Sequence, residues 1–163
     1  MTAATNTKAI ESIQKSIDQI LSDVSGLSEQ DIRWNPTPEE WSILQVVSHL
    51  NEATPYWLGE VERVLAEPGA KWGRGLTDPA RLAAVENPDA LDVQAQLDEL
   101  KNNKQQVADR LGSLTEEQLQ AENPHRNFEK FGNKPVSFII GHFIDEHLQK
   151  HVGQVQRNIG KLA

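Results

Sequence analysis

The chain has 163 residues, enough to bury a core, so we expect residues 1–163 to form a single domain. Its net charge is −8, from 16 Lys+Arg against 24 Asp+Glu, and no stretch of the sequence is strongly basic. Nucleic acid and anionic membranes are therefore excluded as expected partners. The sequence also lacks cysteine, which excludes disulfides, cysteine-ligated zinc and a cysteine nucleophile.

The sequence predicts a cytoplasmic protein. No apolar run reaches the roughly 20 residues that span a bilayer, and residues 1–16 lack the basic-then-apolar order of a secretory signal. Any bound metal would have to be held by histidine, carboxylate and water.

The first half of the chain predicts two long helices. The first covers Thr5–Ser25, where apolar residues recur at three- and four-residue steps. The connector Leu27–Glu40 contains one helical turn that Ser28 can cap. The second helix covers Ser42–Glu67, and Pro55 within it predicts a kink near residues 51–54.

The middle of the chain predicts a long crossover. Pro68–Asp89 is rich in glycine and proline and reads as irregular, with Trp72 folding back over the end of the bundle. Such a connector lets the helices on either side run parallel rather than as a tight hairpin. The third helix is expected at Ala90–Leu111, which has one apolar stripe and an otherwise polar circumference.

The last third predicts a short helix, a loop and a fourth long helix. Leu114–Leu119 has Thr115 in position to cap it, Asn123–Lys134 reads as a polar loop, and Pro135 begins the helix that runs to Lys161. No period-two pattern indicates a sheet. The sequence therefore predicts an all-α four-helix bundle with long crossover connections.

The fourth helix directs two histidines inward. At about 100° per residue, His151 falls within roughly 20° of Ile144 on the apolar stripe, His147 within roughly 60°, and His142 about 160° away. Histidines at i and i+4 stand about 6 Å apart along the axis on nearly the same face. Burying two imidazoles in an apolar seam is unfavourable unless their nitrogens find partners, and one metal ion would satisfy both.

A third ligand is available from the second helix. His49 lies at the flank of that helix's apolar stripe, where a cleft between neighbouring helices is expected. His125 reads as a solvated loop residue. The candidate metal site is therefore His49, His147 and His151, although a buried histidine network without metal would give the same spacing.

Several polar residues could support the histidines. Tyr56 and Gln154 are weak candidates for catalytic or supporting roles, because a ligating imidazole commonly donates its other N–H to a neighbouring acceptor. Glu60 is a further candidate, whereas Glu52, Asp145 and Glu146 read as surface residues. Trp41 is expected to pack at the bundle end, with the wall of a substrate pocket as the alternative.

Four short motifs resemble the DinB-like superfamily, which includes YfiT-type proteins and thiol-dependent S-transferases. They are Glu40-Trp41-Ser42-Ile43, His49-Leu50, Asp145-Glu146-His147 and His151-Val152-Gly153-Gln154. The resemblance covers nearly the whole chain. It implies a four-helix bundle, a metal held by His49, His147 and His151, a homodimer, and enzymes that use low-molecular-weight thiols.

We therefore expect a metal-dependent enzyme of thiol S-transferase or hydrolase type that acts on a small-molecule substrate. Three histidines leave coordination positions open, unlike a structural zinc site. Zinc is the first choice of divalent metal and nickel the second, since all-nitrogen ligation suits both. The alternatives are a non-catalytic binding or sequestration protein that uses the same cleft, and a purely structural bundle.

Overall fold

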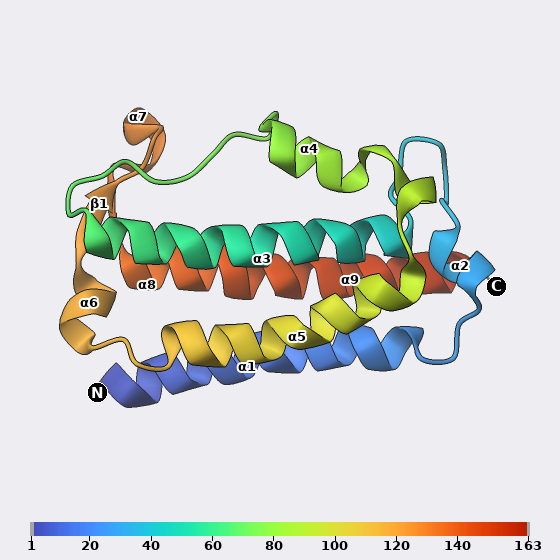
Figure 1. The fold of residues 1–163 in the computed structure, drawn as a ribbon, viewed down its shortest axis with the longest axis horizontal. Helices are drawn as coiled ribbons and strands as arrows, with labels where there is room; N and C mark the ends of the chain where they lie inside the picture. The colour runs from blue at the N-terminus through green and yellow to red at the C-terminus, as the bar shows by residue number, and fades with distance from the viewer. Residues whose placement is uncertain (1, 163) are drawn as a thin grey trace.

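The computed structural model describes the backbone of residues 2–162 and the side chains of residues 6–162. Four long helices lie side by side: α1 (Thr2–Val24), α3 (Ile43–Ala66), α5 (Val93–Leu111) and the helix that ends in α9 (Glu146–Lys161) (Figure 1). The predicted four-helix bundle is confirmed. Met1 and Ala163, which the predicted domain includes, lie outside the described residues.

The long connections allow neighbouring long helices to run parallel as well as antiparallel. Helices α3 and α5 run parallel to each other, as predicted, and α1 and α9 run the opposite way (Figure 1). The remaining elements are short: α2 (Glu29–Arg33), α4 (Pro79–Glu86), a 3-10 turn (Pro88–Ala90), α6 (Glu116–Gln120), β1 (Glu122–Pro124), α7 (Phe128–Phe131), β2 (Asn133–Pro135), α8 (Val136–Phe138) and the π-helix η2 (Ile139–Asp145). No helix within residues 2–162 is long and apolar enough to cross a membrane.

The core lies between the four long helices, and α3 is the element most surrounded. It packs against α4, α5, η2 and α9. Its buried side chains therefore occupy more than one stripe, and they include polar residues such as Ser48, His49 and Glu60. A fully buried leucine or valine contributes about 1.5–3 kcal/mol relative to exposure, so these contacts fix where α3 presents His49.

Reciprocal capping pairs mark the starts of α2, α3 and α6. Ser28, Ser42 and Thr115 each accept a hydrogen bond from the backbone N–H three residues on, and the side chain at that position returns one. The predicted caps at Ser28 and Thr115 are thereby confirmed. Helix α3 continues across Pro55 as one element.

The crossover between α3 and α5 is partly helical, so its prediction as irregular was wrong over α4. Asp78 caps this helix, and α3 holds it by two hydrogen bonds: Gln45 Nε2 donates to the Val85 carbonyl (2.9 Å) and Ser48 Oγ to the Ala84 carbonyl (2.6 Å). None of its side chains is buried, so it leaves no apolar stripe for sequence analysis to detect. The third long helix begins at Val93, three residues later than predicted.

The segment predicted as a polar loop contains a short antiparallel pair, β1 with β2, in which Asn123 lies opposite Lys134. Three-residue strands are too short to show alternation. His125 is 5% exposed, so its prediction as a solvated residue was wrong. It lies between Trp72, from the crossover, and Phe131, with ring centroids 4.5 and 4.4 Å away. Burial lowers the pKa of His125.

The fourth long helix is not regular. It begins with α8, continues as the π-helix η2 and becomes an α-helix only at Glu146. A π-helical segment is wider than an α-helix and occurs frequently at functional sites. Here it ends two residues before His147.

Candidate functional site

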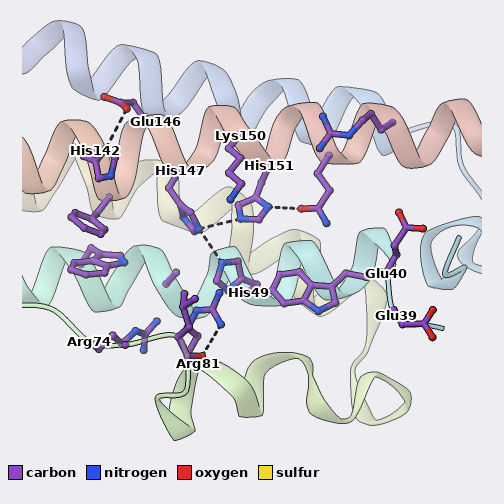
Figure 2. A pocket seen from close by; sticks show the side chains of 18 residues that line it. Glu39, Glu40, His49, Arg74, Arg81, His142, Glu146, His147, Lys150 and His151 are labelled. Atoms are coloured by element: carbon purple, nitrogen blue, oxygen red, sulfur yellow. Dashed lines mark hydrogen bonds and ion pairs between the residues drawn. The ribbon is translucent and has the colours of Figure 1, made fainter. Parts of the chain in front are cut away.

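Three histidines meet between α3 and α9 (Figure 2). His49 comes from α3, and His147 and His151 from successive turns of α9. The Nε2 atom of His147 lies 3.0 Å from Nε2 of His49 and 3.0 Å from Nε2 of His151. One nitrogen from each ring lies within 4.8 Å of the others, so the three can reach a single ion.

The three imidazoles are neutral near pH 7. His49 is 2% and His151 5% exposed, and His147 is partly buried. Burial, reinforced by neighbouring positive charge, lowers the pKa of His49 to about 3 and that of His147 to about 2, and lowers the pKa of His151 in the same direction. A neutral imidazole has a free lone pair, which is the form that binds metals.

Hydrogen bonds among the rings cannot satisfy all three nitrogens. Gln154 Oε1 lies 2.7 Å from His151 Nδ1 and accepts its hydrogen, so His151 Nε2 carries only a lone pair. A hydrogen on His147 Nε2 could point at His151 or at His49, but not at both. Nδ1 of His49 is also buried without a hydrogen-bond partner among the described residues. A cation that accepts three lone pairs fits this arrangement of donors.

Trp41 forms a wall beside the histidines. Its ring centroid lies 5.0 Å from that of His49 and 6.4 Å from that of His151, with the latter pair stacked. Asn158 Nδ2 donates to the Trp41 carbonyl (2.9 Å), which ties the start of α3 to α9. Trp41 packs against the core two residues before the start of α3, and it also lines the pocket. The predicted alternative, the wall of a pocket, agrees with the structure.

The histidines open into a pocket of about 830 Å³. Its apolar walls include Trp41, Trp57 and Phe143, and the last two rings stack with centroids 4.4 Å apart. Charged residues complete it: Glu39, Glu40, Arg74, Arg81, Glu146, Lys150 and Arg157. The pocket therefore combines aromatic surface with charge next to the histidines.

The other candidates from the sequence lie in different surroundings. Tyr56 donates a hydrogen bond to Glu60 Oε1 (3.1 Å), and burial raises its pKa. Glu60 is buried and also binds Arg63 and the backbone N–H of Gly73, so it links α3 to the crossover rather than to the histidines. Of the two weak candidates, Gln154 contacts the trio and Tyr56 belongs to the Glu60 network.

The three residues predicted to lie on the surface, Asp145, Glu146 and Glu52, make different kinds of contact. Asp145 accepts a hydrogen bond from Ser12 Oγ of α1 (2.6 Å), and Glu146 contacts His142 on the exposed side of the helix. Glu52 forms an ion pair with Arg74, whose side chain is only 7% exposed, so Glu52 is a structural partner and not a free surface group.

Arg81 and Lys150 also line the pocket, although no sequence pattern indicated either residue. Arg81 lies on α4, within the segment predicted to be irregular, so no face could be assigned to it. Lys150 lies about 120° from Ile144 at 100° per residue, away from the apolar stripe, and its side chain is exposed, so the stripe did not indicate it.

Comparison with known proteins identifies one family whose model matches most of the chain. The family model of the DinB superfamily matches residues 12–155, which include all three histidines. A solved structure described as YfiT from Bacillus subtilis, "a probable metal-dependent hydrolase with an unusual four-helix bundle topology", is similar with a TM-score of 0.74 and 16% sequence identity. The similarity covers 95% of this chain and 87% of that one, and at this identity it concerns the fold. No curated protein matches the sequence.

Proposed function

This chain belongs to the DinB superfamily, and on that premise we propose that it is a metal-dependent enzyme that acts on a small molecule. His49, His147 and His151 would hold a divalent cation. The observation that carries the proposal is the convergence of three imidazole nitrogens within 4.8 Å of one another beside an open pocket. The cytoplasmic location and the homodimer stay predictions.

Three protein ligands leave a position for substrate or water, as in catalytic rather than structural zinc sites. Zinc is the first choice and nickel the second, because the donor set is all nitrogen. A bound cation of this kind supplies Lewis-acid chemistry and lowers the pKa of a coordinated water or thiol. Gln154 holds the hydrogen of His151 on Nδ1, so that Nε2 faces the other two rings.

Two reaction types follow from this chemistry: hydrolysis with water, and transfer to a low-molecular-weight thiol. The chain has no cysteine, so the thiol would have to come from a substrate. A pocket of about 830 Å³ falls within the range of small-molecule sites, which favours a small substrate in either case. The alternative of a non-catalytic binding protein would use the same pocket.

The test begins with the metal content of protein purified without a histidine tag, before and after addition of Zn²⁺. We expect about one equivalent per chain, abolished by His147→Ala and retained by the control His142→Ala, which changes an exposed histidine on the same helix. Less than about 0.2 equivalents in the wild-type protein would end the metal proposal.

Catalysis is tested with the zinc-loaded protein, a panel of cellular thiols with electrophilic acceptors, and ester and amide substrates. We expect turnover that His147→Ala abolishes. A rate unchanged by that substitution would contradict metal-dependent catalysis. Saturable substrate binding without turnover would favour the binding protein instead.

A further inference from the structure

The pocket contains three positively charged side chains without an ion-pair partner among the described residues. Arg81, Lys150 and Arg157 all line it, and within residues 6–162 none of the three forms an ion pair. Four other arginines form ion pairs, Arg33 with Glu29, Arg63 with Glu60, Arg74 with Glu52 and Arg110 with Glu62, whereas Arg126 forms none within residues 6–162.

Arg81 is the clearest case. Its Nη1 donates to the Leu76 carbonyl (3.0 Å), which uses one of the five N–H donors of a guanidinium. The residue is partly buried, and its helix, α4, is held against α3 by the hydrogen bonds from Gln45 and Ser48. The fold therefore holds Arg81 at the pocket with most of its donors unused.

Arg81 and Lys150 approach the histidines from different elements. Figure 2 shows Arg81 beside His49 on the α4 side and Lys150 beside His151 on the α9 side. Both charged side chains line the same pocket as His49, His147 and His151. The same charges oppose the binding of a divalent cation unless a negative group lies among them.

We propose that the pocket recognises its substrate through an oxyanion group, a carboxylate or a phosphate, held by Arg81 and Lys150 next to the three histidines. The planar guanidinium matches the two oxygens of such a group, and the ammonium adds a second point of charge. The aromatic walls accommodate an apolar body. This inference deepens the proposed function by naming the class of substrate, and it rests on that function for the role of the histidines.

The experiment compares three probes that share a phenyl body: 3-phenylpropionate, its uncharged amide 3-phenylpropionamide, and 2-phenylethyl phosphate. Dissociation constants are measured by NMR titration on the metal-free and on the zinc-loaded protein. We expect the anions to bind about tenfold or more tightly than the amide, because charge-assisted hydrogen bonds are lost in the amide. The better-bound anion identifies the group as carboxylate or phosphate.

Variants assign the preference to the two cations. Arg81→Gln and Lys150→Gln should each weaken anion binding about tenfold and leave amide binding nearly unchanged. Lys101→Gln is the control, since it removes one positive charge from an exposed position on α5 outside the pocket. The circular dichroism of each variant verifies its fold.

Equal binding of the anions and the amide overturns the inference, as does the absence of binding by either anion. A preference that survives both Arg81→Gln and Lys150→Gln also overturns it. Measurements on the metal-free protein separate this result from the proposed function. If the protein takes up no zinc but prefers anions through Arg81, the inference stands and the metal proposal fails. If the protein takes up zinc but shows no anion preference, the metal proposal stands and the inference fails.

Discussion

At the scale of single residues, Gln154 decides which nitrogen His151 presents. Its amide oxygen lies 2.7 Å from Nδ1, one turn along the same helix, and holds the hydrogen there. Nε2 is then free to face His147 and His49. His49 has no equivalent partner for its Nδ1. The orientation of His151 is therefore fixed by hydrogen bonding, whereas that of His49 depends on packing, including contact with Trp41.

We predict that Gln154→Ala weakens zinc binding about 10- to 100-fold, the usual effect of removing the partner of a ligating histidine. Competition with a chromogenic chelator measures the affinity. Gln156→Ala is the matched control, because Gln156 is an exposed glutamine on the same helix that contacts Asp23. Equal affinities for the two variants would show that His151 is oriented by packing alone.

Two of the three histidines, His147 and His151, could be related to each other from the sequence because their relative positions depend on local helix geometry. His147 and His151 are four residues apart on an apolar face, and that relation holds in any α-helix. Trp41 and His125 could not be placed in this way. Each is positioned by contacts with segments distant in sequence: Trp41 by Asn158, and His125 by Trp72.

At the scale of elements, the crossover from α3 to α5 decides the composition of the pocket. Its first part is held by Arg74, which lies over the Tyr56 ring at 3.9 Å and pairs with Glu52 of α3 and with Asp78, the cap of α4. Its second part carries Arg81. Polar contacts of this kind leave no periodic signal, which explains why the bundle and the presence of a crossover could be predicted and the helix α4 within it could not.

We predict that Glu52→Gln destabilises the protein by about 1–3 kcal/mol, because it leaves the largely buried Arg74 guanidinium with a weaker partner. The control is Glu62→Gln, which alters the more exposed pair with Arg110 and should cost less than about 1 kcal/mol. Urea denaturation of the metal-free variants measures both changes. Equal losses would mean that Arg74 is not an anchor of the crossover.

At the scale of the whole molecule, the buried histidines lower the free energy of unfolding by an amount that depends on pH. The folded protein keeps His49 and His147 neutral, with a pKa of about 3 and about 2, against an ordinary value of 6.5. Below pH 6.5 the unfolded chain binds protons at these positions and the folded chain does not. Stability therefore falls as the pH is lowered from 6.5 towards the folded pKa values.

We predict that the metal-free protein loses about 2 kcal/mol of unfolding free energy for each of these two histidines between pH 6.5 and pH 5, at about 1.4 kcal/mol per pH unit. His147→Leu should remove one such contribution, and the control Gln156→Leu, at an exposed position without a titrating group, should remove none. Urea denaturation at the two pH values measures the difference. If the wild-type protein and His147→Leu lose stability equally, the acid sensitivity arises elsewhere, for example at His125, whose pKa is also lowered by burial. A smaller loss in His147→Leu would instead show that the bundle keeps these imidazoles unprotonated and ready to bind a cation, at the expense of its own stability in acid.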